Sequence, residues 1–195
     1  MTLPRLVQAT GAPGEELRER SDDELMALAC AGVRRAFEVL VARHAQRLVQ
    51  LCARFVQDEQ LGRDLAQDVW VMVYQRRESY RPEGRFQVWL ITVARNHCRN
   101  QLRRSNVARG ARDGLEQGEP APAQIERILR EECQRRVRDA LSELSPAMRE
   151  ALLLRFAEEL RYDEMTQVVG AGENTLRSRV HHGLRALKQK LERDR

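Results

Sequence analysis

The stretch that decides the fold is NTLRSRVHHGLRALKQKL, from Asn174 to Leu191 near the end of the chain. Arginine and lysine crowd most of its polar positions, and no acidic residue occurs between Glu173 and Glu192. This pattern predicts an amphipathic helix with one face toward a core and a basic face toward an anion. The apolar residues recur at helical spacing and are Leu176, Val180, Leu184, Leu187 and Leu191.

A second helix is predicted just upstream, over residues 162–169. Between the two helices, Gly170 and Gly172 supply a tight turn, and Asn174 is a plausible N-cap for the basic helix. A helix, a short glycine turn and a basic second helix form the layout of a helix-turn-helix, whose second helix lies in the DNA major groove. The alternative is an ordinary helical hairpin with a solvated basic face.

The whole chain has the composition of a helical globular protein. Its 195 residues are 32% charged and only 5% aromatic, and runs of alternating β-branched residues are hard to find. We therefore expect an all-α fold of two small helical domains. The net charge of +5 and the pI near 9.4 favour a polyanionic partner, although the local basic clusters matter more than the sum.

Several function classes find no support in the sequence. Cys30, Cys52, Cys98 and Cys133 lie far apart without a CxxC pair, so we expect buried free thiols and neither a zinc site nor a disulfide framework. No glycine-rich phosphate loop and no metal-spaced set of histidines and carboxylates occurs, so we expect no enzyme activity, metal or cofactor. No run is long enough for a signal peptide or a membrane span, and we expect a cytoplasmic protein.

Capping and turn residues divide the chain. Residues 1–20 lack periodicity and are predicted to be a mobile leader. Ser21 with Glu24 forms a capping box that starts the first domain, over 21–104, and Asp58 caps a later helix of that domain. Residues 105–124, rich in Gly, Ala and Pro, are predicted to be a linker. The second domain, over 125–195, contains a further helix start at Ser145 and Pro146.

One predicted helix of the first domain, after Asp58, has an acidic face. Leu61, Leu65, Val69 and their neighbours face a core. The opposite sector combines acidic and amide groups with apolar surface, and Trp70 flanks it. This face is either a docking surface for a basic protein partner or a solvated acidic face. Its polar members include Gln60, Asp64, Gln67, Asp68 and Gln75.

The next predicted helix, over 86–104, has a basic face that also carries amides. No acidic residue occurs from Arg85 to Arg112. Cations suit phosphates, and the amides of Asn96 and Asn100 can both donate to and accept from a base edge, so a nucleic-acid surface is favoured over a solvated one. Trp89 is expected in the core, although its edge could meet a displaced base. The buried stripe is predicted to be Phe86, Trp89, Leu90, Val93, Ala94 and His97, and the polar face Thr92, Arg95, Asn96, Arg99 and Arg103.

Taken together, these features resemble the extracytoplasmic-function sigma factors of bacterial RNA polymerase over about residues 22–191. DLAQDVWVMVYQ at 64–75 looks like region 2.2 of that family, and FQVWLITVARNHCRNQLRR at 86–104 looks like regions 2.3 and 2.4. LSELSPAMREALLLRF at 141–156, together with NTLRSRV at 174–180, looks like region 4. The order and spacing of the stretches carry the resemblance.

The resemblance implies a subunit that binds core polymerase, directs it to specific promoters and assists promoter melting without hydrolysis. The first domain would dock on the β' clamp and capture an unstacked base of the −10 element, and the second would touch the β flap and bind the −35 duplex. The clamp contacts carried over by position are Asp64, Gln67, Asp68 and Trp70. The −10 contacts are Trp89, Arg95, Asn96, Arg99, Asn100 and Arg103. The −35 contacts are Asn174, Thr175, Arg177, Ser178, Arg179, His181, His182 and Arg185.

The chain departs from the family pattern in the basic helix. His182, Gly183 and Leu184 replace the usual arginine, alanine and arginine, and Thr166 replaces an alanine. A glycine inside a helix costs about 1 kcal/mol against alanine, so Gly183 requires a packing or DNA-approach reason. The family commonly uses an anti-sigma factor, which the resemblance implies as a partner. Two other hypotheses are a stand-alone helix-turn-helix regulator, which leaves the acidic face unexplained, and a helical adaptor with no nucleic-acid role.

Overall fold

The computed structural model describes residues 15–83, 85–106 and 125–193. Within these ranges the regular structure is helical and no strand occurs, as the expected all-α class requires. The first domain contains α1 (Glu15–Arg18), α2 (Asp22–Cys30), α3 (Arg34–Val56), α4 (Glu59–Gln75), the 3₁₀ turn η1 (Arg77–Ser79) and α5 (Phe86–Asn106). The second contains α6 (Ile125–Ser142), α7 (Pro146–Leu152), the π-helical turn η3 (Leu153–Ala157), α8 (Tyr162–Val169) and α9 (Glu173–Arg193).

Local capping chemistry starts several helices where the sequence predicted. The Ser21 side chain accepts a hydrogen bond from the Glu24 amide at 3.3 Å, and the Glu24 carboxylate accepts one from the Ser21 amide at 2.8 Å. Asp58 accepts from the Leu61 amide at 2.9 Å at the start of α4. Ser145 caps α7 directly before Pro146. These caps fix the helix starts independently of the tertiary fold.

The core of the first domain lies where α3, α4 and α5 pack together. Leu40, Leu51, Val69 and Val73 are almost completely buried in it. Helices α3 and α4 cross so closely that a Cβ on Gly62 would lie 2.5 Å from the backbone of Ala53. Only glycine fits at this crossing. The acidic side of α4 therefore keeps a fixed orientation relative to α3.

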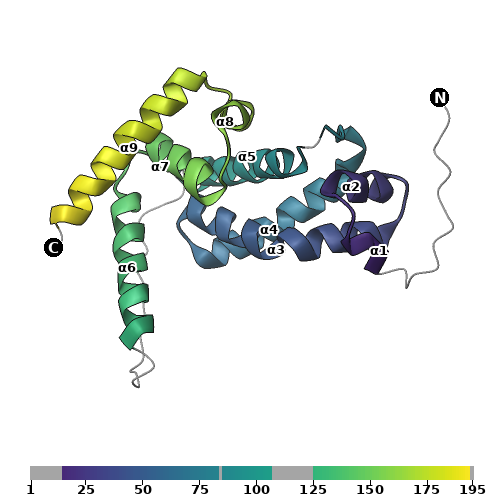
Figure 1. Cartoon of the computed structure of the whole chain (residues 1–195), viewed down its shortest axis with the longest axis horizontal. Coiled ribbons are helices and arrows are strands. Elements are labelled where there is room, and N and C mark those ends of the chain that lie inside the picture. The colour runs from purple at the N-terminus through teal and green to yellow at the C-terminus, as the bar shows by residue number, and fades with distance from the viewer. Residues whose placement is uncertain (1–14, 84, 107–124, 194–195) are drawn as a thin grey trace.

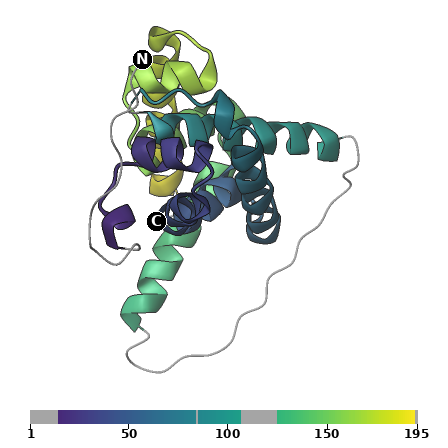
Figure 2. The same cartoon turned by 90° about the vertical axis from the view of Figure 1, so that its right-hand side faces the viewer.

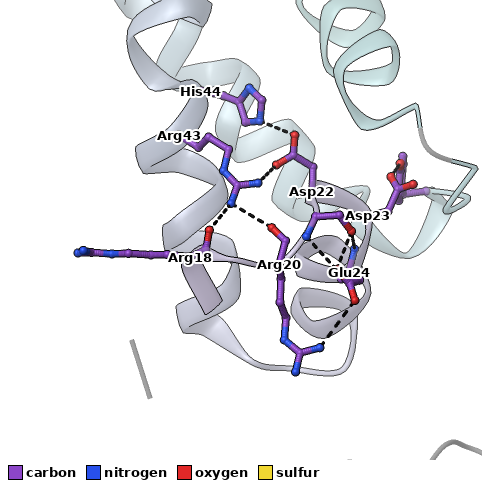
Figure 3. Close-up of polar contacts among 9 residues, drawn as sticks. Arg18, Arg20, Asp22, Asp23, Glu24, Arg43 and His44 are labelled. Atoms are coloured by element: carbon purple, nitrogen blue, oxygen red, sulfur yellow. Dashed lines mark hydrogen bonds and ion pairs between the residues drawn. The ribbon is translucent and has the colours of Figure 1, made fainter. Parts of the chain in front are cut away.

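The amino-terminal helices are tied to α3 by one ionic cluster (Figure 3). Arg43 pairs with Asp22 and also donates to the carbonyl oxygens of Arg18 and Arg20, both at 3.0 Å. His44 Nε2 lies 2.8 Å from the second carboxylate oxygen of Asp22. The prediction of a mobile leader over residues 1–20 is therefore wrong for the last part of that range, because Glu15–Arg18 form α1, which packs on α3. Residues 1–14 lie outside the described residues.

The second domain forms a helix-turn-helix from α8 and α9. Gly170 has φ +70° and closes α8, as the turn predicted from its sequence requires. The prediction of Asn174 as N-cap is wrong, because α9 already begins at Glu173 and the amide of Leu176 donates to the carbonyl of Gly172 at 3.1 Å. Gly183 is buried where α9 crosses α7, and a Cβ there would lie 3.2 Å from Leu152 side-chain atoms. Packing is therefore the reason for the glycine.

The apolar side of α9 is buried only along its first half. Leu176 is fully buried and Val180 is 5% exposed, whereas Leu184 is 42% exposed, and Leu187 and Leu191 are half-buried. The expectation that Leu184 faces the core is wrong because Gly183, one residue earlier, lies at the crossing with α7, and Leu184 is exposed beside it. Helix α6 supports the far end, where Arg136 donates to the carbonyl of Leu191 at 3.3 Å.

The two domains pack directly on each other. Figure 1 places α7 and α8 over α5, with α9 on the outer side and α6 extending away from the body. Figure 2, turned by 90°, also shows α5 against the second domain. Ser105 and Asn106 of the predicted linker belong to α5, and residues 107–124 lie outside the described residues. Among the helices described, none is long and apolar enough to cross a membrane.

Candidate polymerase and nucleic-acid interfaces

The acidic face of α4 is open to solvent. Asp64, Gln67 and Asp68 are exposed, as the sequence predicted for this side of the helix. Asp64 accepts a long 3.5 Å hydrogen bond from Gln60, and Asp68 Oδ2 lies 3.1 Å from Nε2 of His97 on α5. The side chain of Asp68 is 63% exposed, so this contact leaves its charge accessible to a partner. The face can accept hydrogen bonds and ion pairs from a basic surface.

An aromatic group borders the acidic face. Trp70 is half-buried, its ring meets Phe37 edge-on with centroids 5.9 Å apart, and its Nε1 has no hydrogen-bond partner within the described residues. Beside it, Val71 is 55% exposed and Tyr74 is 43% exposed. Exposed apolar groups next to charges are typical of docking surfaces. Tyr74 was missed from the sequence, although it follows Trp70 at helical spacing.

The polar face of α5 is exposed at most of its predicted positions. Asn96, Arg99, Asn100 and Arg103 all lie open to solvent along the carboxyl-terminal half of the helix. Trp89 is half-buried in an aromatic cluster, with its ring centroid 5.1 Å from that of Tyr80. Amides and guanidinium groups along one open helix face suit a nucleic-acid strand.

Arg95 contradicts the expectation of an exposed polar face. It is only 5% exposed and lies between the domains. Its Nε and Nη2 donate to the two carboxylate oxygens of Glu150 on α7 at 2.6 and 3.2 Å. Its Nη1 donates to the carbonyl oxygen of Val168 on α8 at 3.2 Å. The sequence could not reveal this, because the partners are 55 and 73 residues away along the chain.

A second buried stripe on α5 explains the position of Arg95. Val88 and Ile91 are 6% and 2% exposed, and with Arg95 they recur at spacings of three and four residues. This stripe lies beside the predicted one and brings α5 against α8. In the sequence, Val88 and Ile91 are apolar residues outside the predicted buried stripe. They are the signal that α5 is buried on two sides rather than one.

Glu158 forms the other polar contact between the domains. Arg47 of α3 donates to its carboxylate at 2.8 Å and to its carbonyl oxygen at 3.0 Å, and Gln87 of α5 donates to the same carbonyl at 3.2 Å. Glu158 is 2% exposed, and its Oε1 has no partner within the described residues. Burial raises the pKa of Glu158 above its ordinary value, and the charges of Arg47 and Arg54 offset only part of that effect.

The basic face of α9 points to solvent. Arg177 donates to Glu173 at 2.9 Å and lies over the ring of Tyr162, 4.3 Å from its centroid, so the guanidinium is positioned by both groups. Arg179 is half-buried. The other predicted −35 residues are exposed and are Asn174, Thr175, Arg177, Ser178, His181, His182 and Arg185. In the part of the chain that the structure describes, no cluster of His, Cys, Asp and Glu could hold a metal ion.

The comparisons with known proteins agree with this architecture. Residues 40–107 match the family Sigma-70 region 2, and residues 134–187 match Sigma-70, region 4. The chain is 30% identical to the RNA polymerase sigma-H factor of Pseudomonas aeruginosa, over 90% of this chain and 96% of the relative. It is 34% identical to the RNA polymerase sigma factor CarQ of Myxococcus xanthus, over 82% and 91%.

Two solved structures share the fold. CnrH in complex with the cytosolic domain of CnrY superposes with a TM-score of 0.68 and 25% identity, covering 89% of this chain and 99% of that one. The sigma factor RpoE in complex with the anti-sigma factor NepR from Bartonella quintana superposes with a TM-score of 0.64 and 20% identity, covering 82% and 98%.

The chain belongs to the sigma-70 family of bacterial RNA polymerase sigma factors. Within it, the chain falls in the extracytoplasmic-function group, to which named relatives such as the sigma-E factor of Haemophilus influenzae also belong. It binds core RNA polymerase, directs it to promoters and assists their opening. The match to region 2 includes α4 and its acidic face. The hypothesis of a stand-alone helix-turn-helix regulator leaves this face unexplained.

Proposed function

We propose that α4 is the main docking element for core polymerase. Asp64, Gln67 and Asp68 supply the charge and hydrogen-bond acceptors, and Trp70 supplies apolar contact. The observation that carries the proposal is that these polar groups are exposed beside exposed Val71 and Tyr74. A basic coiled coil such as the β' clamp has the complementary chemistry.

The exposed face of α5 then contacts the melted −10 strand. Asn96 and Asn100 read base edges, while Arg99 and Arg103 follow the phosphates. Trp89, which is half-buried and precedes Asn96 by two helical turns, borders a displaced base. Arg95 joins them only after it leaves Glu150. The second domain contacts the β flap and presents the basic face of α9 to the −35 duplex, with arginines suited to guanine edges and phosphates.

The remaining assignments follow from this role. The first domain runs from α1 at Glu15 to the end of α5 at Asn106, the second runs from α6 at Ile125 to the end of α9 at Arg193, and residues 107–124 join them. The protein acts where the polymerase and the chromosome are, in the cytoplasm, and carries out no catalysis of its own. Both similar solved structures are complexes with a second protein, one of them an anti-sigma factor, and this supports an anti-sigma factor as a regulatory partner of the chain.

The docking proposal is tested by the Asp68→Arg variant. Reversing an exposed charge in the docking face should abolish stable association with core polymerase while leaving the helix content unchanged. Association is measured by co-elution or fluorescence anisotropy, and helix content by circular dichroism. Glu38→Arg is the matched control, because Glu38 is an exposed acid of the same domain outside α4. Core affinity equal to wild type in the folded Asp68→Arg variant contradicts the assignment.

Promoter opening is tested by the Asn96→Ala variant. The variant should form the closed complex almost normally and open the duplex less, because an amide that reads an unstacked base acts only after melting. Closed complexes are measured by gel shift at low temperature and opening by permanganate reactivity of unpaired thymines. Equal losses in the two steps would argue against base capture.

A further inference from the structure

A hollow with a basic lining lies between α1 and the first half of α3. Its volume is about 460 Å³, within the range of sites that bind small molecules. Half of its lining residues are arginines, and none of them belongs to the surfaces proposed above for polymerase or promoter DNA. The lining residues are Arg18, Arg35, Glu38, Val39, Ala42 and Arg43.

One guanidinium in the hollow, that of Arg43, is held in place by the chain itself. It pairs with Asp22 and donates to the carbonyl oxygens of Arg18 and Arg20, both at 3.0 Å. These bonds use Nη1 and Nη2, so Nε is left for another acceptor. A cation that is fixed before a ligand arrives loses little side-chain entropy when the ligand binds. Because Asp22 offsets part of its charge, most of the positive potential must come from the other two arginines.

Arg18 and Arg35 supply that potential from the two walls of the hollow. Both residues are exposed, and neither guanidinium forms a hydrogen bond or an ion pair with another described residue. Figure 3 shows the side chain of Arg18 extending away from Asp22, with no dashed line at its guanidinium. Two guanidinium groups on facing helices are therefore free to bind an anion.

Acidic residues of the same helices do not neutralise the hollow. Glu38 is the one acid in the lining, and it pairs at 3.0 Å with Arg34, which lies outside the hollow. Glu16 and Glu19 of α1 are exposed and do not line it. The chain contains no acid over residues 39–57, which cover the rest of α3. The hollow therefore attracts anions.

We propose that this hollow binds a small compound with adjacent phosphate groups, such as inorganic tripolyphosphate or a nucleoside triphosphate. A guanidinium binds phosphate oxygens through two parallel hydrogen bonds, so Arg18 and Arg35 suit two neighbouring phosphates. Val39 and Ala42 lie between Arg35 and Arg43 and give the hollow an apolar part that an uncharged ring can cover. A concave site of this volume favours a small ligand over a nucleic-acid duplex. The proposal does not depend on the roles proposed for α4, α5 and α9.

Hydrogen exchange of the full-length chain with tripolyphosphate tests the proposal. Exchange in α1 and in the first half of α3 should become slower, because a ligand held by Arg18 and Arg35 ties the two helices together. The concentration that gives half of this protection measures the affinity of this site separately from that of other basic surfaces.

A charge reversal in the hollow and a matched reversal outside it make the test specific. Arg35→Glu should raise the concentration for half protection about tenfold or more, as expected when a hydrogen bond to a charged group is lost. Arg81→Glu is the control and should leave it unchanged, because Arg81 is an exposed arginine of the same domain that does not line the hollow. If circular dichroism shows that Arg35→Glu loses helix, Arg18→Gln removes the other free guanidinium and gives the same test.

The outcomes also separate the possible ligands. Protection by ATP at a lower concentration than tripolyphosphate supports the proposal and assigns the apolar part to the base, whereas equal concentrations support binding through the phosphates alone. Absence of protection in α1 and α3 overturns the proposal, and so does an equal loss in the Arg35→Glu and Arg81→Glu variants. Protection of the same helices by single-stranded DNA or polyglutamate at lower concentrations than tripolyphosphate also overturns it, because the hollow would then belong to a macromolecular interface.

Discussion

At the scale of single residues, two glycines lie where helices cross, Gly62 against Ala53 and Gly183 against Leu152. Gly183 breaks a helical pattern, and the sequence alone already indicates that it needs a special reason. Gly62 lies near the start of α4, where the sequence gives no sign that a glycine is required. Yet a Cβ at Gly62 would lie closer to its neighbour than a Cβ at Gly183 would. The distance from a missing Cβ to another helix depends on the packing of the whole domain. Neither the requirement at Gly62 nor its partner Ala53 can be read from local pattern.

The two glycines give a graded prediction of stability. Gly62→Ala should lower the free energy of unfolding by about 1–3 kcal/mol, because the new Cβ meets the backbone of Ala53, which cannot move aside. Gly183→Ala should cost less, since its Cβ meets the flexible end of Leu152 and alanine favours the helix by about 1 kcal/mol. Urea unfolding followed by circular dichroism measures both. A larger loss for Gly183→Ala would contradict the steric account.

At the scale of elements, several helix starts were predictable, whereas the partners that bury each helix were not. Ser21, Asp58 and Ser145 each bond the backbone of residues within the next turn, so a few letters of sequence contain the whole interaction. The environment of α5 depends on the second domain, and its stripe through Val88 and Ile91 has no local cause. The exposure of the polar faces of α4 and α9 was predictable because it depends mainly on the pattern of one helix.

The docking of α2 on α3 depends on Asp22. Partial burial by itself raises the pKa of Asp22, but the hydrogen bonds and charges of His44 and Arg43 outweigh it and lower the pKa. This contribution to stability is therefore present above the ordinary pKa of an aspartate and is lost as the pH falls through the lowered value. Asp22→Asn should loosen α1 and α2 and cost about 1–2 kcal/mol.

Hydrogen exchange of the full chain measures this loosening, with faster exchange expected in α2 than in wild type. Glu38→Gln is the control, because it removes an exposed pair with Arg34 that contributes little. Equal rates of hydrogen exchange in α2 of the Asp22→Asn and Glu38→Gln variants would contradict a special role of the cluster in Figure 3.

At the scale of the whole molecule, we expect Glu158 to make the packing of the two domains depend on pH. The pKa of Glu158 is raised where the domains pack together, which we call the closed arrangement, and Arg47, Arg54 and Glu159 are the charged groups around it. We expect this pKa to fall toward its ordinary value when the domains separate and water reaches the carboxylate. The closed arrangement therefore binds more protons. Its stability is greatest below the ordinary pKa of a glutamate and falls as the pH rises through the raised value.

The expected result is a smaller radius of gyration near the ordinary pKa of a glutamate than at about pH 7.5 for the free chain in small-angle X-ray scattering measurements. Glu158→Gln removes the titrating group and keeps the backbone carbonyl that accepts from Arg47 and Gln87. It should flatten the pH dependence over this range. An unchanged pH dependence in that variant would assign the effect to another group.

The hydrogen bond between Asp68 and His97 has a consequence for where transcription begins. It joins the proposed docking face of α4 to α5, the proposed reader of the melted strand, and both helices pack against α3. With the roles proposed for α4 and α5, attachment to the polymerase sets the distance between the strand-reading helix and the enzyme's catalytic centre. We therefore expect the geometry of the first domain to determine the length of DNA between the opened base and the first copied nucleotide.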